Sequence, residues 1–299
     1  MKKILILVGR SKTNINTFHK ELKKRIGDDA SVDIAHFEDI IIDIEEKNTS
    51  IFSGKTNIAD YDITYFRRAG AGFLWLAATI ALYLESLGKT YFDSTYKEVG
   101  PTGTKLNSFV KLALSGLPII PSIYCDKANI LENCDMIIEK LGLPLVVKDL
   151  YSQRGLGVFL IKNKEDIKTL VAEKPHKKFM FQKFIDKREE FRVLVLGETI
   201  GSYERKTSTD PNEFRNNVSL GASEEFIDMS EISEAVKYIS IKAAKVLNIQ
   251  IGGVDVVIDA HDKIWLLEVN RGPGFTYNSD KSPEMDSVTE YFKTELAKS

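Results

Sequence analysis

Two carboxylates and an amide stand in an otherwise apolar hairpin near the end of the chain. The segments 254–259 (VDVVID) and 264–269 (IWLLEV) are typical of strands, and the short polar stretch between them predicts a turn. Glu268 and Asn270 are two residues apart, so on a strand they point to one face, and Asp255 near the start of the partner strand should meet them. Since a buried, unpaired carboxylate is costly, this hairpin predicts a cation site.

The oxygen atoms of these three side chains indicate which cation. Carboxylate and amide oxygens are hard ligands, and magnesium typically takes one or two carboxylates and completes its shell with water and substrate phosphates. Asp255, Glu268 and Asn270 therefore predict a magnesium site. The alternative, that Asp255 and Glu268 are solvated ends of ordinary strands, stays open on the hairpin alone.

Basic and glycine residues that precede this hairpin in the chain could bind the phosphates of a magnesium-bound nucleotide. Lys148 lies inside the apolar segment LPLVVKDL, where a lysine needs an anionic partner or must reach an edge. Gly155 and Gly157 follow in a loop whose backbone N–H groups can face phosphates, although a plain hairpin loop has the same pattern. Together with Lys105, these features predict a nucleoside triphosphate cleft between two lobes.

The pattern of strands and helices divides the chain into three parts. Strands are expected at 4–8, 31–37, 63–66 and 90–92, with helices at 14–24 and 74–87, which is a parallel, doubly wound order. We therefore expect a Rossmann-like α/β domain over residues 1–100. Helices followed by antiparallel-type strands predict two α+β subdomains, a central one over 101–185 and a C-terminal one over 186–299 that carries the metal site.

Composition excludes several classes of partner. The 41 basic and 43 acidic residues give a net charge of -2, which argues against nucleic acid. The longest apolar stretch, 73–84, has 12 residues, whereas a membrane span needs about 20. Two cysteines without a signal peptide predict a reducing, cytoplasmic location and no disulfide framework.

The order of these motifs resembles a known family. Lys105, VVKDL…QRGLGV, FQKFI, EFRVLVLG, ER…EFRNN, GGVDVV and LLEVN…PG follow one another as in the ATP-grasp superfamily, and they are most similar to RimK-like α-L-glutamate ligases. The resemblance covers roughly residues 101–274 and extends loosely over the N-terminal lobe. It implies an ATP-grasp fold preceded by a Rossmann-like domain.

The resemblance also assigns residues to ATP. It implies that Lys105 and Lys148 contact the phosphates, that residues 152–157 form a lid, and that the segment Gln182–Ile185 reads adenine, largely through the backbone of Lys183 and Phe184. Glu190 stands at the position that binds ribose. The complete set implied for ATP is Lys105, Lys148, Gln153, Gly155, Gly157, Gln182, Lys183, Phe184, Ile185, Glu190, Asn216 and Asn217.

Three arginines and two metal ions complete the implied chemistry. Arg192, Arg205 and Arg215 would face the phosphates and an acyl-phosphate as catalytic residues. Asp255, Glu268 and Asn270 would bind two magnesium ions, with Glu268 bridging them and manganese as an alternative ion.

The substrate side departs from the family pattern. The motif SNLHRGG reads NNVSLGA here, and EVNASPG reads EVNRGPG, which places Arg271 where a small residue is common. Arg67 or Arg68, in YFRR, resembles the basic segment near the acceptor and would hold a substrate carboxylate; a surface charge at a strand end is an equal alternative.

The resemblance implies an enzyme that uses ATP to join a carboxylate to an amine through an acyl-phosphate. The expected partners are an amino acid, with glutamate the leading choice, and an amine on a peptide, protein or metabolite; a homo-oligomer is a further expectation. Three alternatives remain: a peptide-modifying or peptide-cyclising ligase, a non-catalytic nucleotide-binding regulator, and an ATP-grasp kinase.

Overall fold

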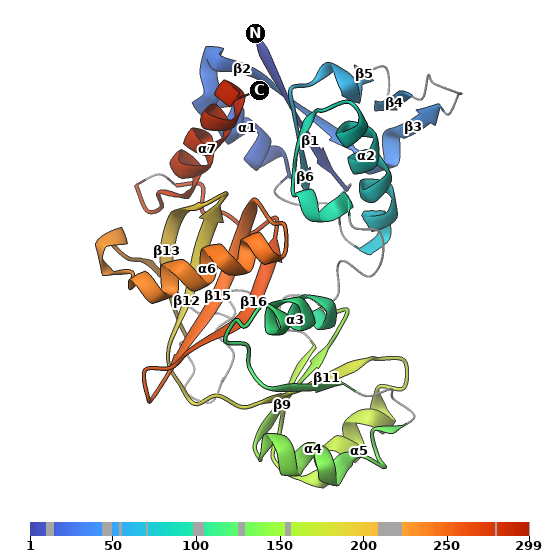
Figure 1. Ribbon diagram of the computed structural model, residues 1–299, viewed down its shortest axis with the longest axis vertical. Helices are drawn as coiled ribbons and strands as arrows, with labels where there is room; N and C mark the ends of the chain where they lie inside the picture. The colour runs from blue at the N-terminus through green and yellow to red at the C-terminus, as the bar shows by residue number, and fades with distance from the viewer. Residues whose placement is uncertain are drawn as a thin grey trace.

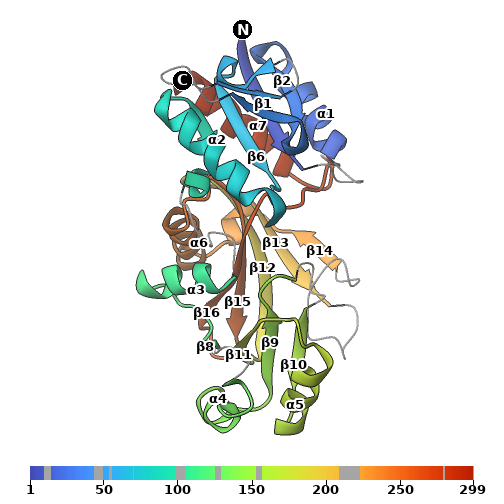
Figure 2. The same ribbon diagram turned by 90° about the vertical axis from the view of Figure 1, so that its right-hand side faces the viewer.

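Three lobes stack along the long axis of the molecule in an order that differs from their order in the chain (Figures 1 and 2). In this computed structural model, the sheet formed by the last third of the chain lies between the N-terminal lobe and the central lobe. The structure describes residues 1–9, 15–43, 50–53, 56–69, 71–97, 105–124, 129–152, 157–208, 223–278 and 280–298. Within this part of the chain, no helix combines the length and the apolar character that a membrane crossing requires.

The N-terminal lobe has a four-stranded parallel sheet in the order β2-β1-β6-β7. Helix α2 packs on one face and helix α1 on the other, so the expected doubly wound arrangement is confirmed. A small antiparallel sheet, β3-β4-β5, was not expected from the sequence. The elements are β1 (Lys2–Val8), α1 (Ile15–Ile26), β2 (Ala30–His36), β3 (Ile40–Asp43), β4 (Ser50–Ser53), β5 (Thr56–Asn57), β6 (Ile63–Arg67), α2 (Leu74–Ser86) and β7 (Thr90–Phe92).

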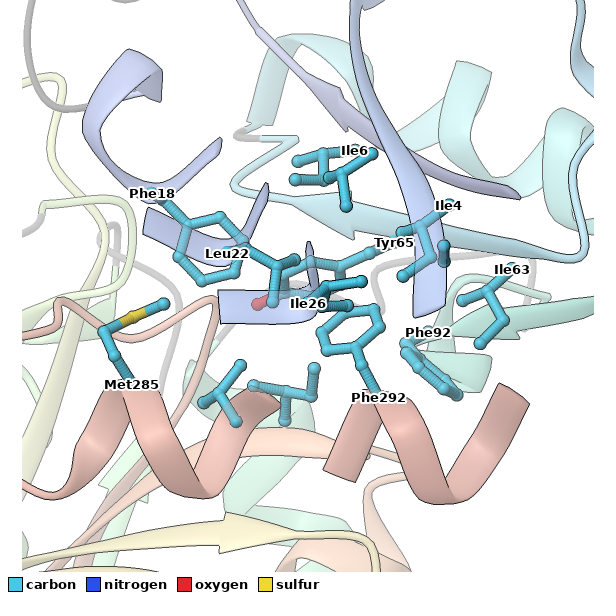
Figure 3. Close-up of a cluster of buried hydrophobic side chains, with 14 of the residues drawn as sticks. Ile4, Ile6, Phe18, Leu22, Ile26, Ile63, Tyr65, Phe92, Met285 and Phe292 are labelled. Atoms are coloured by element: carbon cyan, nitrogen blue, oxygen red, sulfur yellow. The ribbon is translucent and has the colours of Figure 1, made fainter. Parts of the chain in front are cut away.

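The C-terminal helix α7 (Glu284–Lys298) completes the core of this first lobe. Figure 3 shows Phe292 of α7 among Ile4, Tyr65 and Phe92 of the parallel sheet. Leu194, Leu196 and Ile251 of the C-terminal sheet belong to the same cluster. The N-terminal and C-terminal lobes therefore share one continuous hydrophobic core.

The central lobe is an antiparallel sheet in the order β10-β9-β11-β8. Two helices cover one face, where Phe179 and Phe181 pack with Ile137 and Ile167. Met180 and Lys148 point to the opposite face, because side chains alternate along a strand. The elements are β8 (Ser122–Tyr124), α4 (Cys134–Leu141), β9 (Leu145–Asp149), β10 (Val158–Ile161), α5 (Lys164–Glu173) and β11 (Phe179–Lys183).

The C-terminal lobe is built on a five-stranded antiparallel sheet in the order β14-β13-β12-β15-β16. Helix α6 covers one face, and Ser233 caps it by accepting a hydrogen bond from the Val236 backbone N–H at 3.2 Å. The elements are β12 (Lys187–Leu196), β13 (Thr199–Thr207), β14 (Ser223–Phe226), α6 (Glu234–Val246), β15 (Ile251–Asp259) and β16 (Ile264–Arg271).

Helix α3 (Lys105–Leu114) lies between the central and C-terminal lobes (Figure 1). Leu112 packs into the core beneath α6, whereas Phe109 contacts Met180 of the central sheet. The following segment runs beside β16, where the Leu266 backbone N–H donates to Pro118 O at 2.8 Å. The lobe boundary expected at residue 101 is therefore followed by helix α3, which packs against both the central and the C-terminal lobes.

A buried carboxylate holds the N-terminal lobe to the start of β15. Asp93 has no exposed surface, and its Oδ1 accepts hydrogen bonds from the backbone N–H groups of Gln250 and Ile251 at 2.6 and 2.9 Å. Its Oδ2 has no hydrogen-bond partner. Burial raises the pKa of Asp93 to about 7, although the two backbone donors and the charge of Arg271 oppose the shift.

We predict that Asp93 makes the protein less stable as pH rises from about 4 to about 7. The folded state retains the proton to about pH 7, whereas the unfolded chain releases it near its ordinary pKa of about 4. Asp93→Asn keeps an acceptor for both backbone donors and cannot ionise. The free energy of unfolding of this variant, measured by denaturant titration, should exceed that of the wild type by more at pH 8 than at pH 5. An equal difference at both pH values would contradict this assignment.

Candidate functional site

The C-terminal sheet brings the three predicted metal ligands together. Asp255 on β15 pairs in register with Glu268 on β16, and Gly253 pairs with Asn270. Asn270 Nδ2 donates to Asp255 Oδ2 at 3.0 Å. The convergence expected for this hairpin is therefore present.

Asp255 also receives two positive charges from neighbouring strands. Arg192 on β12 donates through Nε to Oδ1 at 2.9 Å and through Nη2 to Oδ2 at 3.0 Å, and Lys206 Nζ on β13 donates to Oδ1 at 2.9 Å. Burial alone would raise the pKa of Asp255, but Arg192 and Lys206 outweigh it and lower the pKa to about 2. Asp255 is therefore a carboxylate at neutral pH.

The surroundings of Asp255 limit how it can bind a metal. A carboxylate accepts about four hydrogen bonds, and Arg192, Lys206 and Asn270 already supply four to Asp255. Metal coordination by Asp255 must therefore replace one of these donors. Glu268 is more open, with 35% of its side chain exposed.

The donor set fits magnesium that arrives with a phosphate ligand. Among the described residues, no cluster of three or more His, Cys, Asp and Glu side chains forms a metal cage on its own. Two carboxylates and one amide are the few protein ligands that magnesium needs when phosphates and water supply the rest. The roles of Asp255, Glu268 and Asn270 as metal ligands, and the number of ions, remain predictions.

Two lysines face this group from the other lobes. Lys105, the first residue of α3, places Nζ 3.8 Å from Glu268 Oε1 and donates to Ser152 O at 2.7 Å. Lys148 on β9 is only 8% exposed, and its Nζ lies 6.0 Å from the centre of the Phe109 ring. Burial lowers the pKa of Lys148, and the charge of Glu268 opposes that shift. A buried lysine beside carboxylates is well placed to bind an anion.

The base of the glycine loop is fixed by Asp149. This buried carboxylate accepts hydrogen bonds from the Ser152 hydroxyl and, at 3.1 Å, from the Tyr151 backbone N–H, and Lys177 Nζ lies 2.8 Å from it. The Asp149 backbone N–H donates to Gly157 O at 2.8 Å and so closes the base of the loop. Gln153 and Gly155 lie outside the described residues.

One cavity of about 750 Å³ joins these groups. Its walls come from all three lobes and contain most of the residues predicted from the sequence. They include Arg68, Lys105, Lys148, Gly157, Gln182, Lys183, Phe184, Ile185, Glu190, Arg192, Asp255, Glu268, Asn270 and Arg271.

The residues expected at the base and the ribose line one side of this cavity. Strand β11 ends at Lys183, whose backbone N–H donates to Pro121 O at 2.9 Å, and Phe184 and Ile185 continue the wall. Glu190 is buried, and its Oε2 accepts from Lys187 Nζ at 2.7 Å. Their contacts with a nucleotide remain predictions.

Arg205 and Arg67 are not brought into the cavity. Arg205 pairs in register with Phe191, places its guanidinium 5.7 Å from that ring and donates to Glu225 at 3.3 Å, on the face of the sheet opposite to Arg192. The buried guanidinium of Arg67 lies 4.1 and 4.8 Å from the ring centres of Phe18 and Phe275, so it packs between lobes. The remaining candidates, Arg215, Asn216 and Asn217, lie outside the described residues.

Arg68 and Arg271 flank the loop that follows β16. Arg68 has a φ of 55° and donates through Nε to Gly272 O at 3.2 Å. A Cβ at Gly272 would lie 3.1 Å from Arg68 Cγ and backbone N, and Gly272 itself has a φ of 56°, so glycine suits this close approach. The guanidinium of Arg271 lies 5.0 Å from the centre of the Tyr96 ring.

Lys206 and Asp149 were not identified from the sequence. Strand alternation could have identified Lys206, because Glu204 and Lys206 are two residues apart on β13 and therefore point to the same face. Arg192 and Asp255 lie on that face of the sheet. No comparable signal marks Asp149, because its partners Ser152 and Lys177 come from a loop and from a distant segment.

Comparisons with known proteins place this chain in a family. The model of the RimK-like ATP-grasp domain matches residues 104–290, more than half of the chain. A probable alpha-L-glutamate ligase of Legionella pneumophila is 26% identical over 211 residues, which span 69% of this chain and 67% of the relative. The coenzyme gamma-F420-2:alpha-L-glutamate ligase of Methanocaldococcus jannaschii is 32% identical over 151 residues, 48% of this chain and 50% of the relative.

A solved structure has the same fold over nearly the whole chain. The ATP-grasp ligase PsnB, complexed with a minimal precursor, Mg and ADP, superposes with a TM-score of 0.73 at 17% identity, covering 98% of this chain and 97% of that chain. The expected ATP-grasp architecture is therefore confirmed.

We predict that Gly157→Ala disturbs the base of the glycine loop. A Cβ at Gly157 would lie 2.4 Å from Ser152 Cβ and 2.8 Å from Asp149 Cβ. Relief of such a clash typically costs about 1 to 3 kcal/mol, so nucleotide affinity measured by calorimetry should fall about fivefold or more. Gly72→Ala is the matched control, because a Cβ there meets nothing within 4 Å. Unchanged affinity in Gly157→Ala would show that the loop base does not position the nucleotide.

Proposed function

This chain belongs to the RimK-like ATP-grasp family of ligases, which form carbon–nitrogen bonds, and we propose that it uses ATP to join the carboxylate of one substrate to the amine of another. The observation that carries the proposal is the cavity in which buried Lys148, together with Lys105, faces the Asp255, Glu268 and Asn270 group. Cations for phosphates and hard oxygen ligands for a metal thus share one enclosed space.

The proposed reaction has two steps. An oxygen of the substrate carboxylate attacks the γ-phosphorus of ATP, the bond to the β–γ bridging oxygen breaks, and ADP leaves. The amine then attacks the carbonyl carbon of the resulting acyl-phosphate, inorganic phosphate leaves, and the nitrogen loses a proton as the amide forms. Both steps need orientation and charge stabilisation more than covalent help from the protein.

The residues divide this work by position. Lys105 and Lys148 bind the phosphates from the side of the central lobe, and Arg192 holds Asp255 ionised on the opposite side. Asp255, Glu268 and Asn270 would hold two magnesium ions, with manganese as an alternative, and the bound ions would neutralise phosphate charge. The glycine loop acts as a lid that keeps water from the acyl-phosphate.

The proposed substrate is an amino acid, with glutamate first, added to an amine of a peptide, protein or metabolite. The two curated relatives are named as glutamate ligases, which supports glutamate. The structural neighbour is complexed with a precursor, which supports a peptide-modifying or cyclising ligase as the second candidate.

We predict that Glu268→Ala and Lys148→Ala each lower amine-dependent release of ADP and phosphate by at least about 100-fold, because each loses several kcal/mol of charge stabilisation. The assay supplies ATP, magnesium and each amino acid in turn, and mass spectrometry identifies the product. The controls are Glu198→Ala and Lys245→Ala, an exposed ion pair at 2.7 Å outside the cavity wall. Undiminished turnover in both test variants would refute the site.

The same assay separates the alternative functions. ATP binding without consumption would support a regulator, and a phosphorylated product would support a kinase.

We predict that Arg271→Ala and Arg68→Ala raise the KM of the carboxylate-bearing substrate about tenfold or more, because hydrogen bonds to charged groups contribute about 1.5 to 3 kcal/mol. The KM of ATP should change less than threefold, since both arginines line the cavity beside the Gly272–Gly274 loop. Steady-state kinetics with each substrate varied separately measures both constants. A rise confined to the KM of ATP would place these arginines at the phosphates instead.

A further inference from the structure

Lys105 is held by the backbone of Ser152 more closely than by the carboxylate beside it. Its Nζ donates to Ser152 O at 2.7 Å, whereas Glu268 Oε1 lies 3.8 Å away, beyond hydrogen-bond distance. An ammonium group has three N–H donors, so a single carbonyl oxygen can fix the position of Lys105 and leave donors for the cavity that it lines. The place of Ser152 O therefore decides where this positive charge lies.

Ser152 is in turn held by Asp149. The Ser152 hydroxyl donates to Asp149 Oδ2, and the Tyr151 backbone N–H donates to Oδ1 at 3.1 Å. The carboxylate of Asp149 thus closes a turn over residues 150–152. The Asp149 backbone N–H donates to Gly157 O at 2.8 Å on the far side of the loop. Because the turn and the hydroxyl both restrain Ser152, its carbonyl oxygen has a defined position.

Lys177 keeps Asp149 charged although the carboxylate is buried. The side chain of Asp149 is 1% exposed, and Lys177 Nζ lies 2.8 Å from Oδ2. Burial alone would raise the pKa of Asp149, but the hydrogen bonds from Lys177 and the Ser152 hydroxyl outweigh it and hold the pKa below its usual range. Asp149 is therefore a carboxylate at neutral pH, and a charged acceptor holds the Ser152 hydroxyl more strongly than a neutral one would.

The side chain of Asp149 points away from Lys148, the second phosphate-binding lysine of the proposed function. Asp149 pairs in register with Phe179, which packs beneath the helices of the central lobe. Lys148 pairs with Met180, on the opposite face of the same sheet. Residue 149 contributes to the cavity wall, but its carboxylate is directed to the other side. Its influence on the cavity therefore passes through Ser152.

We infer that Asp149 is a positioning residue for Lys105: it fixes Ser152, whose carbonyl oxygen directs the Lys105 ammonium group toward the phosphates of a nucleotide. This inference rests on the proposed binding of ATP. Without that support, the flexible lysine side chain is free to move toward Glu268, the opposite charge beside it. A nucleotide must then separate an ion pair and reorder the lysine before its phosphates bind, which lowers its affinity.

Calorimetric titration with a non-hydrolysable ATP analogue and magnesium tests the inference without turnover, and adenosine, which has no phosphates, is the reference ligand. Ser152→Ala keeps the backbone carbonyl but lacks the hydroxyl that Asp149 holds. Its affinity for the analogue should fall about tenfold, while its affinity for adenosine should change less than about twofold.

Asp149→Asn should cause the same selective loss, because an amide replaces one of the two acceptor oxygens with a donor. The matched control is Asp135→Asn in the same lobe, where an exposed carboxylate lies 2.6 Å from Lys164. This control should bind both ligands as the wild type does.

A Lys105→Met background separates positioning from general support of the loop. Lys105→Met alone should lower the affinity for the analogue, because a phosphate-binding cation is lost. With no ammonium group left to direct, adding Ser152→Ala should lower that affinity further by less than about twofold. A serine that only supports the loop would cause the same tenfold loss in both backgrounds.

Several outcomes would overturn the inference while the ligase proposal stands. They are an unchanged affinity for the analogue in Ser152→Ala or in Asp149→Asn, an equal loss for the analogue and adenosine, and an equal loss with and without Lys105. An Asp135→Asn variant that loses as much as Asp149→Asn would show a general effect of charge and would also count against it. If the wild type does not bind the analogue, the proposed function and the inference both fail.

Discussion

The buried negative charge of Asp255 organises the centre of this molecule. Arg192, Lys206 and Asn270 reach it from three strands, so four neighbouring strands of the C-terminal sheet are joined through one carboxylate. Charges buried in this way need well-formed hydrogen bonds to offset the loss of water, and removing one partner leaves the others uncompensated. The sheet that carries the proposed metal ligands is therefore cross-linked by side chains at the place where charge must be positioned.

The same sheet face sets the protonation of its neighbours. Glu204 pairs with Arg192 on the next strand, and burial, followed by the charge of Glu224, raises the pKa of Glu204 to about 8. Asp255 remains ionised, whereas Glu204 retains its proton at neutral pH. These two carboxyl groups on one face therefore have opposite protonation states. Asp255 faces two cations at close range, whereas Glu204 faces the second carboxylate of Glu224.

The sequence was sufficient for the features that depend on local periodicity. The hairpin of β15 and β16 and the convergence of Asp255, Glu268 and Asn270 follow from side-chain alternation and a short turn. Features that depend on long-range packing were not accessible. Arg67 and Arg68 are adjacent and chemically identical, yet Phe18 and Phe275 bury the first while the second reaches the cavity. Arg205 packs on Phe191 because of its register on β13, and Lys206 takes the place beside Asp255.

Helix α7 gives the fold an unusual dependence on the order in which the chain is made. Ile4 and Tyr65 in the first lobe pack against Phe292 as well as against helix α1, so one face of the parallel sheet lacks part of its cover until α7 has been synthesised. The N-terminal lobe is therefore the first to be translated and among the last to close. On the ribosome, the part of its apolar face that α7 later covers remains available to chaperones while the lobes that form most of the cavity are still emerging.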